Sequence, residues 1–289
     1  GKPRRRIMLE RDEYVEQAYL FRSLGERSEA SASVQDLLVA LREEILSTTN
    51  LPKALDFLAA ELRHTGSLSA GMQRLGHYFT AFQTYVVGES ERDGGRFDFR
   101  TALEVLRLEA AFRADDLSPA AGFVYQFEVL ARNRLGYDKG LEAVSRDPLY
   151  DATWREWILN VRRQVGLVDL ADLIFARSAY YRKLREQQGS EPESEDRPAL
   201  FGEKEGRIAL AHRRKDPLLL FAALQRHLNY PTVPRVLRAD DQKQVLPLLV
   251  RRMERLEARL KLVEEEQRGG IDLGRFLPGP GGPTFDDPA

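Results

Sequence analysis

The stretch from Asn50 to Val87 constrains the fold of this chain most, because it carries two apolar stripes at helical spacing. In its second half, apolar residues recur at alternating four- and three-residue steps, at Leu68, Met72, Leu75, Phe79, Phe82 and Val86. The first half carries a facing stripe, formed by Leu51, Leu55, Leu58 and Leu62. A short turn rich in Gly and Ser joins the two halves. We therefore expect two continuous amphipathic helices that close as an antiparallel hairpin and form the structural centre.

The rest of the chain shows the same kind of pattern, in which a capping residue precedes an apolar run at helical spacing. Such N-cap residues stand at Ser33, Asn50, Asp98, Ser118, Asp151, Asp169 and Asp216. Gly25 is expected to end a first helix that begins near Leu9, and a single helix is expected from Asp169 to about Gln187. No segment shows a sustained period-two alternation of apolar residues between hairpin turns, so the sequence predicts an all-α fold.

The sequence indicates where the helices lie along the chain more clearly than how they pack together. Helix pairs begin near residues 9, 51, 98 and 139, a spacing similar to the roughly 40–47 residues of HEAT and armadillo repeats. The pairs share no residue pattern. We therefore expect an irregular multi-helix bundle of antiparallel helix pairs, with a short α-solenoid as the alternative.

Composition shifts divide the chain into five segments. Residues 1–187 are expected to form a helical body, and residues 188–198 an acidic flexible linker with two prolines. Residues 199–238 would form a basic helical arm, and residues 239–268 a long helix with coiled-coil heptads. The Gly- and Pro-rich tail, residues 269–289, is expected to be disordered.

The overall composition excludes several classes of site and partner. The formal net charge of −1 gives no global electrostatic reason to expect nucleic acid or an anionic membrane as partner. The absence of cysteine excludes disulfides, thiolate metal sites and cysteine nucleophiles. No apolar run approaches the ~20 residues needed to span a bilayer. The basic N-terminal segment lacks the apolar region of a signal peptide, so a cytoplasmic protein is expected.

The sharpest motif is a heptad seam near the C-terminal end. Apolar residues recur with strict three- and four-residue spacing at Leu246, Leu249, Met253, Leu256, Leu260 and Val263. With Leu246 at position a, the g positions hold Arg252 and Arg259, and the following e positions hold Glu257 and Glu264. A parallel in-register dimer would pair each of these arginines with a glutamate of its partner. The alternative is that the seam packs on the helical body of its own chain.

Two histidines are the best candidates for a catalytic or metal site. Glu61 and His64 have the Glu-x-x-His spacing that di-iron helix bundles use, but such a site needs a second motif that this sequence lacks. His64 is therefore interpreted as a helix-end histidine, and His77 as a surface residue opposite the apolar stripe. We expect no catalytic, metal or cofactor residue, and no bound cofactor. An enzyme with an active site near His64 and His77 remains the alternative.

Two other motifs have structural explanations. Trp154 and Trp157 lie three residues apart on one helix face and are interpreted as core residues. Ser67 and Ser69 superficially suggest a nucleophile elbow, but no strand precedes them, so capping is the better explanation. No phosphate-binding loop or dinucleotide fingerprint is present.

One local excess of positive charge suggests a third function. Residues 199–238 contain eight Lys and Arg residues against three acids. The candidate contacts to nucleic acid or another polyanion are Arg213, Arg214, Lys215, Arg226 and Arg238. Pairing with acidic parts of the same chain is the favoured explanation. The sequence thus predicts a non-catalytic interaction or scaffold protein, a homodimer or the partner of another helical protein, that associates through Leu246 to Val263.

Overall fold

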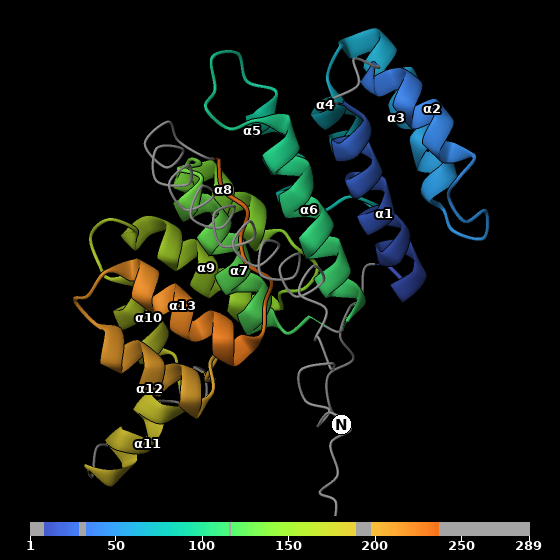
Figure 1. Ribbon diagram of the computed structural model, residues 1–289. Coiled ribbons are helices and arrows are strands. Elements are labelled where there is room, and N and C mark those ends of the chain that lie inside the picture. The colour runs from blue at the N-terminus through green and yellow to red at the C-terminus, as the bar shows by residue number, and fades with distance from the viewer. Residues whose placement is uncertain (1–8, 29–32, 116, 189–197, 237–289) are drawn as a thin grey trace, which may run out of the picture. The chain divides into compact units, whose positions relative to one another are not determined.

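The structure is a computed structural model, which describes residues 9–28, 33–115, 117–188 and 198–236 (Figure 1). These residues form thirteen helices and no strand beyond two isolated bridges, so the predicted all-α multi-helix bundle is confirmed. The helices are α1 (Arg11–Ser28), α2 (Val34–Arg42), α3 (Leu51–Thr65), α4 (Leu68–Arg74), α5 (Ala81–Ser90), α6 (Phe99–Ala114), α7 (Pro119–Arg132), α8 (Tyr137–Ser145), α9 (Ala152–Gln164), α10 (Leu170–Ala176), α11 (Ala179–Gln187), α12 (Glu203–His212) and α13 (Pro217–Leu228). Within these residues, no helix combines the length and the apolar character needed to cross a membrane.

Consecutive helices pack together in several places, but some of the helix pairs do not follow chain order. The most extensive contact joins α1 to α6, although four helices separate them in the sequence (Figure 1). Other pairs of this kind are α5 with α8, α7 with α13, and α10 with α12. In a solenoid each repeat contacts only its neighbours. The described helices therefore form an irregular bundle and not the alternative solenoid.

Most of the predicted N-caps are present. The side chains of Ser33, Asp98, Ser118, Asp151, Asp169 and Asp216 each accept a hydrogen bond from a backbone N–H in the first turn of the following helix. Asn50 is the exception, because its side chain makes no capping bond. Its backbone N and its Nδ2 atom instead donate to Oε1 of Glu13, at 2.7 and 2.8 Å. A tertiary contact with α1 thus replaces the local cap.

The second helix predicted for the central hairpin is divided into α4 and α5. Thr80 begins α5 with a capping box, in which Gln83 N donates to Thr80 Oγ1 (3.1 Å) and Thr80 N donates to Gln83 Oε1 (2.9 Å). Leu75 ends α4, and the intervening turn contains Gly76. Most of the apolar stripe is still buried, including Phe79 and Phe82. The stripe therefore identified the core face correctly, although the prediction of one continuous helix was wrong.

Two other helix boundaries differ from the predictions. Gly25 does not end α1, which continues to Ser28. The helix predicted from Asp169 to Gln187 is interrupted at Ser178, whose side chain accepts from Tyr181 N and starts α11. At this break the backbone N of Ala179 donates to the carbonyl of Phe201, at 2.8 Å. The tertiary contact and the new cap together explain the interruption.

Aromatic side chains fill the centre of the core around α7 and α9. The ring of Phe123 lies 4.7 Å from that of Trp157, and the ring of Phe201 lies 5.2 Å from those of both Trp154 and Trp157. Both tryptophans are buried, which confirms the interpretation that they are core residues.

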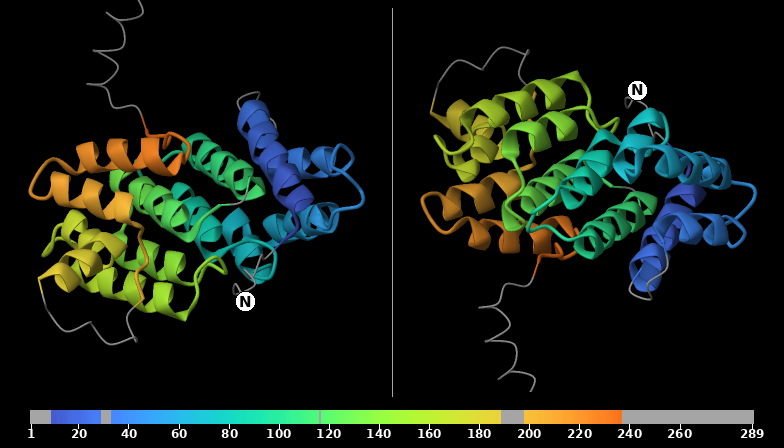
Figure 2. Two further views of the ribbon diagram at one scale, coloured as in Figure 1. Left: turned by 90° about the horizontal axis from the view of Figure 1, so that it is seen from below. Right: turned by 90° about the horizontal axis from the view of Figure 1, so that it is seen from above.

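Of the residues predicted to form a basic arm, 199–236 belong to the same compact unit as the preceding helices. Helix α12 packs on α10 and α11, and α13 packs on α7 (Figure 2). The hydroxyl of Tyr230 donates to Oε2 of Glu128 at 2.6 Å, and Asn133 Nδ2 donates to the carbonyl of Pro234 at 2.9 Å. Residues 198–236 are therefore part of the bundle and do not form a separate arm. The predicted linker lies almost entirely outside the described residues, as do the predicted long helix and tail.

Candidate functional site

The most concentrated group of ionisable side chains lies inside the bundle, around Arg113 of α6. Its guanidinium donates to Oε1 of Glu109, one turn earlier on the same helix, at 2.9 Å. It also forms an ion pair with Asp147, which follows α8. All three side chains are at most 5% exposed. One buried cation thus faces two buried carboxylates, and we call these three residues the buried charge cluster.

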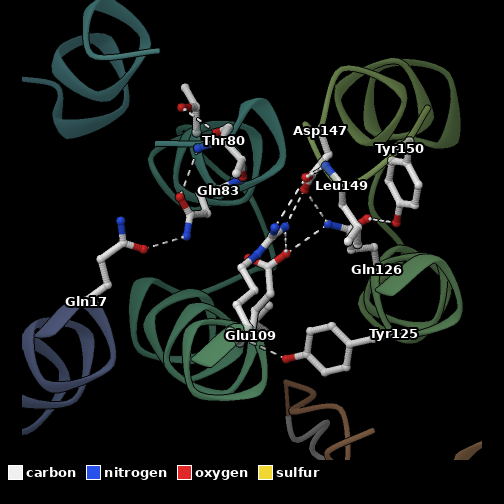
Figure 3. Close-up of polar contacts among 12 residues, drawn as sticks. Gln17, Thr80, Gln83, Glu109, Tyr125, Gln126, Asp147, Leu149 and Tyr150 are labelled. Atoms are coloured by element: carbon white, nitrogen blue, oxygen red, sulfur yellow. Dashed lines mark hydrogen bonds and ion pairs between the residues drawn. The ribbon is translucent and has the colours of Figure 1, made fainter. Parts of the chain in front are cut away.

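Polar side chains from α7 and from the connection after α8 complete this cluster (Figure 3). Gln126 Nε2 donates to Oε1 of Glu109 at 2.8 Å and to Oδ2 of Asp147 at 3.1 Å. The Tyr150 hydroxyl donates to Oε1 of Gln126 at 2.7 Å. Figure 3 shows Gln126 between the two carboxylates and the tyrosine. The network therefore ties α6 to α7 and to the segment that leads into α9.

The electrostatic environment of this cluster is unusual. Burial raises the pKa of Glu109, the positive charge of Arg113 opposes the rise, and the negative charge of Asp147 adds to it. Oε2 of Glu109 and Nε of Arg113 have no hydrogen-bond partner among the described residues. A proton on Glu109 would remove an uncompensated buried negative charge. The carboxyl of Glu109 therefore stays protonated to a higher pH than the carboxyl of an exposed glutamate does.

A second buried polar network joins α1 to α3, to α5 and to the turn before α5. The Tyr78 hydroxyl donates to Oε2 of Glu13 at 2.7 Å, and burial together with this contact raises the pKa of Tyr78. Nearby, Gln83 Nε2 donates to Oε1 of Gln17 at 3.1 Å (Figure 3). These bonds connect residues more than sixty positions apart in the sequence. Their effect is to fix α1 against the segment that follows α4.

Two carboxylates, an arginine and a tyrosine could in principle perform acid–base chemistry, but substrate would have to reach them. Two of the surface hollows are lined by described residues alone. One, of about 530 Å³, lies between α1 and α6 and includes Arg22 and Arg107. The other, of about 400 Å³, lies beside α9 to α11 and includes Trp157 and Arg163. Neither of these two hollows is lined by a member of the buried charge cluster. The bonds of the cluster instead connect α6 to α7 and to the segment after α8.

The two candidate histidines lie on the surface. His64 is exposed in the last turn of α3, as its interpretation as a helix-end residue predicts. His77 is exposed in the turn between α4 and α5. Neither lines the two hollows described above. Within the described residues, no group of three or more His, Asp or Glu side chains could hold a metal ion.

Ser67 of the Gly/Ser turn caps α4, whereas Ser69 lies within the first turn of that helix. Ser67 Oγ accepts from the backbone N of Ala70 at 3.2 Å and so caps α4. The carboxylate of Glu91 accepts from the hydroxyls of Ser67 and Ser69, at 2.8 and 2.5 Å, and from the backbone N of Leu68, at 2.5 Å. A carboxylate at the start of a helix is favoured by the helix dipole. The capping interpretation is confirmed for Ser67, whereas Ser69 is bonded to Glu91.

The four candidate polyanion contacts that the structure describes lie at two places. Arg213, Arg214 and Lys215 lie in the turn before α13, and Arg213 forms an ion pair with Asp172. Arg226 lies in the last turn of α13, so about 13 Å of helix separates it from that turn. Arg238 lies outside the described residues, as does the whole heptad seam from Leu246 to Val263.

Sequence reasoning missed the buried charge cluster, although part of its signal was present. Glu109 follows Ala102 and Leu106 at seven- and three-residue spacing, on the buried face of α6, and Arg113 follows Glu109 by one turn. A charged pair on an apolar face indicates a buried network. The third member, Asp147, could not be assigned, because its proximity depends on how α6 packs against the segment after α8.

Comparison of this chain with protein-family models, with curated proteins and with solved structures found no match.

Proposed function

We propose that this chain is a non-catalytic interaction or scaffold protein that forms a homodimer through its heptad seam, Leu246 to Val263. The main support for this proposal is the pattern of charges that flank the seam. Arg252 and Arg259 at the g positions face Glu257 and Glu264 at the e positions of a parallel partner. Opposite charges at these positions set partner choice and orientation in coiled coils.

The bundle supports a non-catalytic role through the way it uses its ionisable residues. Arg113 and Asp147 are buried and bonded to each other, and Glu109 is bonded to Arg113. Glu13 accepts from Tyr78 and Asn50. These contacts join helices, and no hollow described above leads to them. We therefore do not favour the alternative of an active site near the exposed His64 and His77.

Charge reversal in the full-length chain tests the dimer directly. The variant R252E/R259E places glutamate opposite glutamate in a parallel dimer and should weaken association. Adding E257R/E264R restores opposite charges and should restore the dimer. Sedimentation equilibrium at micromolar concentration measures both effects. A monomeric wild-type chain, or equal masses for the wild type and R252E/R259E, would refute the proposed pairing.

The apolar part of the seam needs its own variant. L249K/L256K places two charges at d positions and should produce a monomer, whereas A258K, at an outward f position, should not. A chain that ends at Arg238 should also be a monomer, with the mass calculated for its own shorter sequence. If L249K/L256K retains the dimer mass, association does not involve the seam.

A further inference from the structure

A small apolar patch stands at one edge of the bundle. It is formed by two pairs of adjacent, exposed aliphatic residues. Leu167 (85% exposed) and Val168 (40%) lie in the connection between α9 and α10. Leu218 (47%) and Leu219 (52%) lie in the first turn of α13. Isolated exposed aliphatic residues are ordinary, but four at two neighbouring connections, one after α9 and one that leads into α13, indicate a contact surface.

Hydrogen bonds hold these two connections together. Oδ2 of Asp169 accepts from the backbone N of Arg214 at 2.8 Å, and Asp172 forms an ion pair with Arg213. Asp169 follows the first apolar pair directly, and Arg214 lies in the turn that leads into the second. The two connections lie at the same edge of the bundle, on the left of Figure 1 and of the left view of Figure 2. We call the four aliphatic residues, with Arg214 and Lys215, the edge patch.

The backbone of the edge patch is already satisfied internally. The N–H groups of Leu167 and Val168 both donate to the carbonyl of Gln164, at 2.9 and 3.0 Å. The N–H of Leu218 donates to Oδ1 of Asp216 at 2.9 Å, and that of Leu219 to the carbonyl of Asp216 at 3.0 Å. An unsatisfied N–H is costly in an apolar medium. These four residues can therefore enter such a medium without exposing a free donor.

The charges around the patch favour an anionic surface. Arg214 and Lys215 are exposed, and neither forms an ion pair with another described residue. The neighbouring acids are engaged: Asp172 pairs with Arg213, while Asp169 and Asp216 cap α10 and α13. Each capping carboxylate is compensated in part by the positive end of its helix. The two cations are therefore available to negatively charged groups outside the protein.

The size of the patch distinguishes between a protein partner and a lipid surface. A stable protein interface buries about 800 Å² on each partner, whereas four aliphatic side chains supply a few hundred Å². A bilayer requires no complementary shape, and its affinity for a protein depends on inserted apolar area together with attraction of cations to anionic lipids. We propose that the edge patch binds the surface of an anionic phospholipid bilayer, with the four aliphatic residues inserted among the headgroups.

Vesicle flotation of the full-length chain tests this proposal. The probe is a vesicle of phosphatidylcholine with about 30% phosphatidylglycerol, a content high enough to give a negative surface potential. The chain should float with these vesicles, float less at high salt, and bind vesicles of phosphatidylcholine alone much more weakly. Equal binding to both vesicles, or no binding to either, would overturn the proposal.

Matched variants locate the contact. R214Q/K215Q should lower the partition coefficient about 30-fold, since each cation near such a surface contributes about a factor of five. L167S/L219S should lower it at least tenfold. The controls are K53Q/K139Q and V39S/L46S, which remove exposed cations and exposed aliphatic residues elsewhere. They should bind like the wild type.

Two further outcomes would contradict the assignment. If the patch variants float like the wild type, another part of the chain binds the vesicles. If L167S/L219S instead lowers the mass of the protein in the absence of vesicles, the patch is an interface between protein copies. Thermal unfolding followed by circular dichroism should show the wild-type midpoint for each variant, because all the substituted side chains are exposed.

Discussion

The substitution Glu109→Gln removes one charge from the buried charge cluster and keeps the length of the side chain. Oε1 of Glu109 accepts hydrogen bonds from Gln126 and Arg113, and an amide oxygen can accept the same two bonds. Oε2 has no partner among the described residues, so the new amide nitrogen replaces an atom that makes no bond to them. The main change is therefore the loss of a titratable group.

The magnitude follows from the raised pKa of Glu109, which burial causes, Arg113 opposes and Asp147 increases. In the unfolded chain this carboxyl titrates near 4.5. Above that pH the unfolded state loses the proton first, so the folded state binds more protons. The stabilising contribution of Glu109 is thus fully present below pH 4.5 and is lost as the pH rises through the folded-state pKa. The loss approaches ~1.4 kcal/mol per pH unit within this interval.

The assay is urea unfolding of the wild type and of E109Q, monitored by circular dichroism at a series of pH values from about 4.5 upward. The free energy of unfolding of E109Q should increase relative to the wild type as the pH rises, and the difference should level off above the folded-state pKa. E104Q is the control, because Glu104 lies on the same helix with a partly exposed side chain paired to Arg107. The raised pKa would be refuted if the free energy of unfolding of E109Q relative to the wild type did not change with pH, or if it increased as the pH fell.

Further substitutions test the packing around the same helices, and urea or thermal unfolding measures each. R113M should lower the free energy of unfolding by about 3–5 kcal/mol, since it leaves Glu109 and Asp147 buried together without a cation. The triple variant E109L/R113M/D147L should recover most of that loss, and a triple variant less stable than R113M would contradict this explanation. G122A should destabilise α7 by ~1–3 kcal/mol, because the new Cβ would lie 2.5 Å from a leucine side chain. G25A should stabilise α1 by ~0.5–1 kcal/mol, since its Cβ would meet the nearest atom at an ordinary 3.9 Å; unchanged or lower stability would contradict the continuous helix.

The predictions that succeeded depend on local chemistry. Asp98 and Asp151 were identified as N-caps because the bond from a capping side chain spans only three residues. The apolar stripe of residues 68–86 identified a buried face, since burial follows helical periodicity. The same stripe concealed the break before Thr80, because the turn between α4 and α5 leaves the spacing of apolar residues nearly unchanged. Periodicity therefore indicates which face is buried better than where a helix ends.

The features that escaped prediction depend on contacts between distant residues. Nothing near Asp147 in the sequence indicates that it meets Arg113, thirty-four positions earlier. The edge patch likewise requires that two connections, near Leu167 and Leu218, lie side by side. The heptad seam is the opposite case, because its spacing and charges can be recognised from the sequence alone. Whether it joins two chains depends on a partner, so the dimer stays a prediction.

The buried polar networks explain how an irregular bundle can have one arrangement. Apolar helix faces pack with similar energy after a shift of one turn, about 5.4 Å. A buried charge makes such a shift costly, because the charge then loses its partner and the free energy of its desolvation is no longer compensated. The networks join residues far apart in the sequence, namely Glu13 with Tyr78, Gln17 with Gln83, Arg113 with Asp147, and Glu128 with Tyr230. We infer that these bonds select the packing of α1, α6 and α13. If so, E109L/R113M/D147L should be stable but less uniquely ordered, with broadened amide resonances in α6 and α7, whereas sharp wild-type-like resonances would show that apolar packing alone fixes the arrangement.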